Sequence, residues 1–145
     1  MIISTGLRNH LLGAGSLKDG LDGGVIRIYS GAVPADADAS IGAATLLCTV
    51  SLNDTGSGIT LDATPSGGVI QKDAGETWSG TPVATGVASF FRFSGTADAG
   101  ALSTTEVRAQ GTVGTVLTDM IVASTTFTAS VLRQIDAFAI GMPAS

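Results

Sequence analysis

The stretch that decides the fold is GVASFFRFSG, residues 86–95. It combines aromatic and β-branched side chains and has a glycine at either end, which is typical of a β-strand set between two turns. A second stretch, VIRIYS at residues 25–30, is also typical of a β-strand, because Ile26 and Ile28 fall on one face and Arg27 and Tyr29 on the other. Each strand carries one arginine, Arg27 or Arg92, that we expect to point outward to solvent.

Other short β segments continue this pattern along the chain. Glycine-rich turns separate them at about the 8–12 residue spacing that is typical of sandwiches and barrels. Further strands are expected at residues 45–52, 59–61, 69–71, 106–111, 115–123, 125–128 and 133–140. The sequence therefore predicts an all-β fold, a jelly-roll-like or related two-sheet sandwich of about eight strands, with a short helical N-terminal segment.

The first residues differ from the rest of the chain. Ser4 or Thr5 can cap a short helix that ends near Gly13, and a second helical turn is expected over residues 16–21. Both pieces are too short to be stable alone, so they must pack on this domain or on a neighbour. We therefore divide the chain into an N-terminal arm, residues 1–22, and a β-sandwich domain, residues 23–145. The candidate assembly interface comprises Leu7, Arg8, His10, Leu11, Leu12 and Trp78.

The composition narrows the class of protein. Only 13% of the residues are charged, against about 25% in an average globular protein. A surface of small uncharged residues packs flat against another surface, because few charged groups must be desolvated. The seven basic residues are scattered, so no nucleic-acid partner is expected, and the absence of a long apolar window argues against a membrane. The chain has no recognisable signal peptide and one cysteine, so synthesis in a reducing cytoplasm and a fold without internal disulfides are expected.

The strongest catalytic motif is the tetrapeptide Asp-Thr-Gly-Ser at residues 54–57, which resembles the signature of retroviral-type aspartic proteases. Asn53 stands where that family usually has an apolar residue, and turn formation between two strands explains the same residues. His10 is the only histidine and lies near no nucleophile motif. Cys48 falls on the apolar face of its strand and is expected in the core. We expect no catalytic residue and no enzyme activity.

Two further motifs, one for a metal and one for a sugar, match their patterns only in part. Asp36 and Asp38 alternate with alanines as in a calcium loop, but the glycine comes one position late and Leu47 stands where an EF-hand has glutamate. Trp78 and Tyr29 could form a sugar-stacking platform, although a single tryptophan in a loop is more often an anchor of that loop. We expect no metal and no cofactor.

Four segments together resemble small virion proteins of tailed bacteriophages, of the head decoration or cement type. They are GGVIRIYSGAVPADAD at 23–38, the strand at 87–94, STTEVRAQGTVGT at 103–115 and QIDAFAIGMP at 134–143. The resemblance implies a jelly-roll-like domain that clamps the outside of a capsid, often as a dimer, and bridges neighbouring capsomers. Its partners would be the major capsid protein or another virion protein, and further copies of itself. The protein would be made in the bacterial cytoplasm and reside in the virion.

Two alternatives stay open at this point. One is a tail- or fibre-associated phage structural protein, which composition does not separate from a head protein. The other is a carbohydrate-binding β-sandwich module that uses Trp78.

Overall fold

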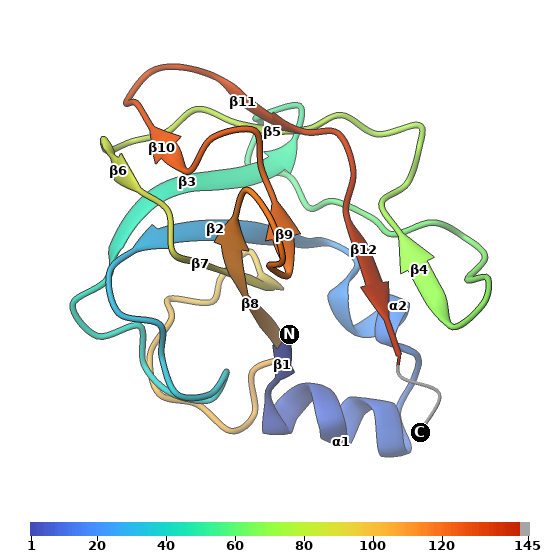
Figure 1. The fold of residues 1–145 in the computed structure, drawn as a ribbon. Coiled ribbons are helices and arrows are strands. Elements are labelled where there is room, and N and C mark those ends of the chain that lie inside the picture. The colour runs from blue at the N-terminus through green and yellow to red at the C-terminus, as the bar shows by residue number, and fades with distance from the viewer. Residues whose placement is uncertain (143–145) are drawn as a thin grey trace.

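A computed structural model describes residues 1–142 and shows a chain dominated by short strands (Figure 1). Strands make up 37% of it and helices 10%. The helices are α1 (Thr5–Gly13) and α2 (Leu17–Leu21). The strands are β1 (Ile2–Ile3), β2 (Gly24–Ser30), β3 (Thr45–Leu52), β4 (Val69–Gln71), β5 (Trp78–Gly80), β6 (Gly86–Val87), β7 (Phe90–Gly95), β8 (Arg108–Gly114), β9 (Met120–Ile121), β10 (Thr126–Phe127), β11 (Arg133–Ile135) and β12 (Ala139–Gly141). The predicted all-β sandwich with a short helical N-terminal segment is confirmed.

One large sheet organises the fold. Its strand order is β1-β8-β7-β2-β3-β5-β11, with β9 added to β8 as the eighth strand. Two small sheets, β10-β6 and β12-β4, complete the strand pairing among the described residues. Figure 1 shows the helices below the large sheet, at the end where the N-terminus lies.

The hydrophobic core lies on one face of the large sheet. Because β2 and β7 alternate and pair in register, Ile26 is opposite Phe93 and Ile28 is opposite Phe91, and all four side chains are buried. Cys48 also lies in this core, as the sequence predicted. The core cluster extends to residues of α1, α2 and both small sheets.

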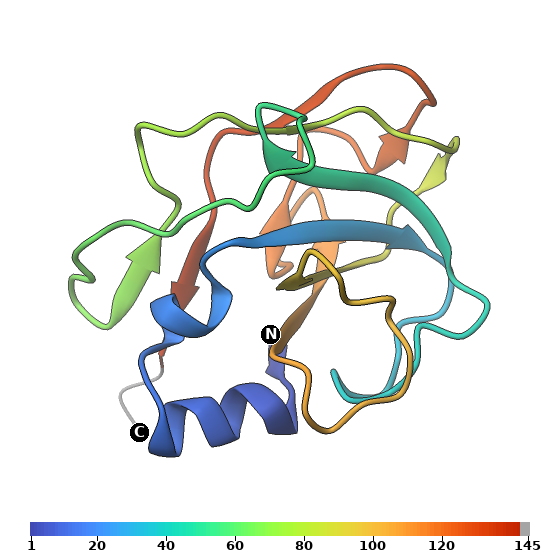
Figure 2. The ribbon, with the colours of Figure 1, turned by 180° about the vertical axis from the view of Figure 1, so that it is seen from behind.

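The opposite face of the large sheet carries buried polar side chains, among them Arg92 and Arg108, and is covered by two long loops. The loops, residues 31–44 and 96–107, lie beside each other in Figure 2, and the Ile41 amide donates to the Gly100 carbonyl at 3.0 Å. Arg92 lies beneath them and is 1% exposed. The prediction that Arg92 points outward to solvent is therefore wrong, whereas Arg27 lies partly exposed at the sheet surface.

The N-terminal segment is part of the same domain. β1 pairs with β8 in an antiparallel ladder, and Ser4, which caps α1, also accepts a hydrogen bond from the Arg108 amide at 2.9 Å. Gly6 sits so close to the segment before β8 that a Cβ there would stand 2.4 Å from the Glu106 carbonyl oxygen. Residues 1–22 thus pack on the β-domain of their own chain, which corrects the expectation of a separate arm.

Several strand boundaries differ from the prediction. The expected strand over 133–140 is divided into β11 and β12, which pair with different partners, β5 and β4. The expected strand over 115–123 is a loop followed by the short β9. Trp78 belongs to strand β5 and not to a loop. Among residues 1–142, no helix is both long and apolar enough to cross a bilayer.

Candidate functional site

Two stretches without a single charged side chain meet at one corner of the molecule. They are residues 77–91 and 120–132. The β6–β10 ladder joins them, and the Ala88 amide donates to the Thr125 carbonyl at 2.8 Å. A further bond joins the Ser130 amide to the Pro82 carbonyl at 2.9 Å. We call residues 82–88 and 125–132 the uncharged corner.

The uncharged corner exposes apolar side chains among small ones. Val83 is 71% exposed, Val87 61% and Leu132 59%, while Val131 beside Leu132 is also exposed. The cores of protein–protein interfaces are depleted in charged residues, and the uncharged corner shares this composition. The residues of the corner itself carry no charge that docking must desolvate, and the nearest charged group in the sequence is Arg133, which lies over the Phe127 ring.

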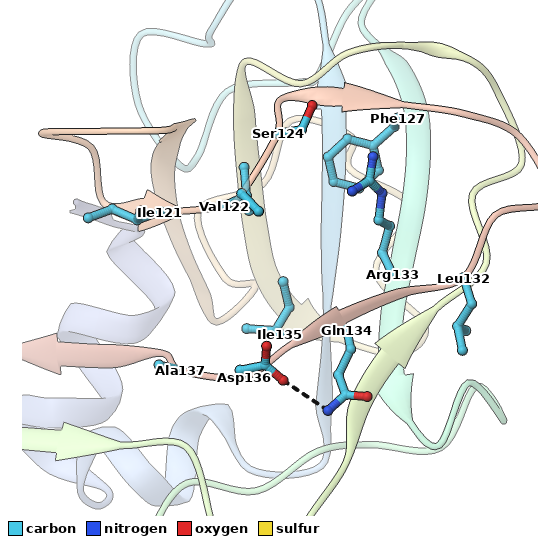
Figure 3. A pocket seen from close by; sticks show the side chains of 11 residues that line it. Ile121, Val122, Ser124, Phe127, Leu132, Arg133, Gln134, Ile135, Asp136 and Ala137 are labelled. Atoms are coloured by element: carbon cyan, nitrogen blue, oxygen red, sulfur yellow. Dashed lines mark hydrogen bonds between the residues drawn. The ribbon is translucent and has the colours of Figure 1, made fainter.

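A groove of about 370 Å³ adjoins the uncharged corner (Figure 3). One wall is formed by residues 121–124 and the other by residues 132–137. Figure 3 shows Arg133 lying over the Phe127 ring, with a guanidinium-to-centroid distance of 4.9 Å. β11 is the last strand of the large sheet, so one of its edges has no strand partner among the described residues. An exposed strand edge beside a groove is suited to an extended peptide segment.

The tetrapeptide at residues 54–57 forms a turn after β3. Asn53 and Asp54 have φ values of 52° and 58°, and the Leu52 amide donates to the Ser57 carbonyl at 3.0 Å. Both Asp54 carboxylate oxygens accept from Thr81, from its amide at 3.1 Å and its hydroxyl at 2.6 Å. The motif thus acts as a turn that is fastened to the loop after β5, in the way its turn residues allow.

The aspartates of the calcium-like loop face other groups of the chain. Asp38 accepts from the Thr5 amide at 2.8 Å and from its hydroxyl at 2.6 Å, and these bonds help to hold the pKa of Asp38 below its ordinary value. The loop carbonyls of Asp36 and Ala39 accept from Arg92. Within the described part of the chain, no three His, Cys, Asp or Glu side chains gather in a metal-binding arrangement.

A buried arginine pair, Arg92 and Arg108, holds the two covering loops to the sheet. Arg108 makes two hydrogen bonds of 2.7 Å to Asp98, and both side chains are almost fully buried, at 1% and 3% exposed. Burial raises the pKa of Asp98, but the hydrogen bonds from Arg108 and from the Gly100 amide outweigh it and leave the pKa lowered. Burial and the nearby charge of Arg108 lower the pKa of Arg92. This cluster is a structural support, and it could not be predicted from the sequence because its partners come from distant loops.

The six candidate interface residues fall into three groups by burial. Leu7 and Trp78 are 0% exposed and belong to the core, which corrects their assignment to an assembly surface. Leu11 is partly buried against the core, and His10 packs between α1 and α2, where a Cβ on Gly15 would stand 2.8 Å from its Nε2. Only Arg8 and Leu12 are exposed, the latter at 86%.

Trp78 is a buried anchor and does not present a binding platform. Its indole Nε1 donates to Glu76 at 2.8 Å, and its ring packs against Phe93 in an edge-type contact and against Phe138 in a tilted one. Tyr29 is 3% exposed and stacks on Phe90, with ring centroids 5.0 Å apart. Neither aromatic ring can stack on a sugar in this fold, so the carbohydrate-binding alternative loses the residues on which it was based.

Sequence motifs do not reveal the uncharged corner, because the feature that marks it is the absence of charged residues. Residues 77–91 and 120–132 could have been found in the sequence by searching for long intervals without Asp, Glu, Lys or Arg. That the two intervals pair through β6 and β10 follows only from the fold.

Comparisons with protein-family models, with curated proteins and with solved structures found no match to this chain.

Proposed function

We propose that this protein is a structural component that attaches to a larger protein assembly through the uncharged corner. The observation that carries the proposal is the pairing of two charge-free stretches around β6 and β10, with Val83, Val87 and Val131 exposed at their surface. Each valine buried on docking contributes roughly 1.5–3 kcal/mol, and no ion pair must be broken to bury it. The proposal assigns no catalytic residue and no cofactor to the chain.

The assembly we propose is a tailed-bacteriophage particle, with the outside of the capsid as the binding surface and the major capsid protein as the partner. The support for this narrower statement is the resemblance of residues 23–38, 87–94, 103–115 and 134–143 to small virion proteins. A decoration protein is repeated over the particle, so a modest contact per copy suffices when each copy bridges neighbouring capsomers.

The test is copurification of the tagged protein with phage particles on a density gradient. We expect tens to hundreds of copies per particle for the unaltered protein, and a loss of about tenfold or more in occupancy for Val87→Asp. The matched control is Leu102→Asp, because Leu102 is 76% exposed in one of the two covering loops, away from the corner. Absence of the protein from purified particles would refute the virion proposal, and equal occupancy of the two variants would refute the role of the corner.

Separated heads and tails distinguish the two virion locations. Recovery of the protein with heads supports the capsid proposal, whereas recovery with tails or fibres favours the tail-associated alternative.

A further inference from the structure

The groove beside the uncharged corner continues as a longer depression along the same two stretches of chain. A second cavity, of about 400 Å³, shares Ile121 and Ala137 with the groove of about 370 Å³. The two cavities therefore adjoin between residues 118–124 on one side and residues 132–139 on the other. We call this continuous depression the trough. Because a strand rises about 3.3 Å per residue, a trough along walls of this length has room for an extended segment of about six residues.

Both walls of the trough have backbone groups without a hydrogen-bond partner. β9 pairs with β8 and β11 pairs with β5, and each of them is the last strand on its side of the large sheet. The amide and carbonyl groups of Ala123 and Ser124 on one wall, and those of Asp136 and Ala137 on the other, make no hydrogen bond with any described residue. Unpaired backbone groups at a sheet edge are a template for a further strand. Since two such edges line the same trough, one added strand can bond to both walls.

Arg133 places a cation in the trough that has no counter-charge. Among the described residues it takes part in no ion pair. Its Nη2 donates to the Thr126 carbonyl, while Nη1 and the buried Nε donate to no described residue. Asp136 also lines the trough, but its carboxylate accepts from the Gln134 amide at 2.9 Å, and Figure 3 shows Arg133 directed instead toward Phe127. A carboxylate is the group that complements this arginine, through charge-assisted hydrogen bonds.

We propose that the trough binds an extended segment of another protein, which adds as a strand between the two walls and places a carboxylate side chain against Arg133. Phe127, Ile135 and Phe138 line the trough and are buried, so the other side chains that point inward should be uncharged. In this mode of recognition the main-chain bonds supply affinity, and the sites for alternate side chains supply specificity.

The segment comes from a different protein and not from a second copy. Every strand among residues 1–142 already pairs with another strand of its own chain, so a second copy has no spare strand to insert. The inference deepens the proposed function, and it rests on that function only for the origin of the segment, which is the assembly partner.

Selection of peptides against the isolated protein tests the proposal. The probe is a displayed library of random peptides of about ten residues, selected for binding to the purified, unaltered protein. We expect the selected peptides to share one Asp or Glu among β-branched and apolar residues. Their affinity should fall by about tenfold or more when that acid is changed to its amide, and equally when Arg133 is changed to glutamine. The two losses should not add when both changes are made, because they remove the same contact.

The matched control is Arg8→Gln, which makes the same chemical change at an exposed position on α1 and should leave the affinity unchanged. The change of acid to amide in the peptide needs no protein variant, so it decides the matter even where Arg133→Gln fails to fold. A selection that yields no binder, or binders whose affinity depends on neither the acid nor Arg133, would overturn the proposal.

Hydrogen exchange of the unaltered protein saturated with a selected peptide tests the added strand. At least one amide of Ala123 and Ser124, and at least one of Asp136 and Ala137, should exchange at least about tenfold more slowly in the complex. The amide of Leu102, in a covering loop away from the trough, should not change. Protection on one wall alone, or on neither, would overturn the strand addition. Because both measurements use the isolated protein, their failure leaves the copurification test intact, and absence of the protein from particles changes only the source of the segment.

Discussion

Replacing Asp98 with asparagine is expected to lower the free energy of unfolding by about 3–5 kcal/mol. The carboxylate makes two hydrogen bonds of 2.7 Å to Arg108 and accepts a third from the Gly100 amide at 2.9 Å. Asparagine has almost the same shape, but its amide group directs a donor at Arg108 where the carboxylate offered an acceptor. The guanidinium of Arg108, which is 1% exposed, is then left without a counter-charge and close to the second buried cation, Arg92.

The magnitude follows from that burial. Hydrogen bonds to charged groups contribute about 1.5–3 kcal/mol each, and a buried ion pair broken by the loss of one member costs about 3–5 kcal/mol because the remaining charge is uncompensated. An exposed carboxylate with no side-chain contact should behave differently. Asp62→Asn is the matched control, since it makes the same chemical change at an exposed position and should alter stability by less than about 0.5 kcal/mol.

Urea unfolding at pH 7, followed by the fluorescence of the buried Trp78, measures the difference. The pH dependence adds an independent check. The pKa of Asp98 is lowered in the folded protein, so the unfolded state binds more protons in acid. The stability from Asp98 is complete above its unfolded pKa of about 3.9 and is lost as the pH falls toward the folded pKa. The gap between unaltered protein and Asp98→Asn should therefore narrow below about pH 4. A loss below about 1 kcal/mol at pH 7 would refute the reasoning.

Three further predictions concern the core and the N-terminal segment. Burial raises the pKa of the Cys48 thiol to about 12, so a thiol reagent at pH 8 should react only after denaturant is added, and rapid reaction of the native protein would contradict this. Gly80→Ala should lower the free energy of unfolding by more than about 2 kcal/mol, because the new Cβ would stand 2.2 Å from the Thr49 carbonyl oxygen. Its control is Gly13→Ala, whose Cβ enters open space at α1, so this change should be neutral or should stabilise the protein by up to about 1 kcal/mol. Leu7→Ala should lower the free energy of unfolding by about 2–5 kcal/mol because Leu7 is in the core. Leu12→Ala should lower it by less than about 0.5 kcal/mol because Leu12 is 86% exposed. Equal losses of stability in thermal unfolding would contradict the packing of α1.

Local signals were sufficient to predict the class of fold and some of its elements. The alternation in β2 and β7 identified the two central strands, because both place apolar residues on a single buried face. Ser4 was one of two predicted caps for α1, and its hydroxyl accepts from the Leu7 amide at 3.0 Å. These signals depend on neighbours in sequence, which is why they could be read without the structure.

Features that depend on distant pairing could not be predicted in the same way. The stretch 133–140 looks like one long strand because its residues suit a strand throughout. It divides because β11 pairs with β5 while β12 pairs with β4, and neither partner is evident from residues near it. A bulge between β2 and β3 likewise places Leu47 in the core beside Cys48, against simple alternation.

The N-terminal segment shows how this limit affects function. Residues 1–22 have helix signals and apolar positions that suit an arm, and the sequence does not tell whether the apolar face meets its own domain or another. Since Leu7 is in the core and β1 extends the large sheet, deletion of residues 2–22 would expose core surface and disturb the fold. Substitutions at exposed positions such as Val87 are therefore a cleaner probe of binding than truncation.

The placement of charge connects the stability of the domain with its proposed role. The loops that cover one face of the large sheet are held by Arg92, Arg108 and Asp98. Some of the few charged side chains of the protein are therefore buried inside the domain. The remaining charges lie outside residues 77–91 and 120–132, and the uncharged corner formed there exposes three valines and Leu132. A surface without charge gains little from long-range steering, so association through it should be slow and insensitive to salt. Occupancy of an assembly that fell steeply between 50 and 500 mM salt would place the contact on a charged surface instead.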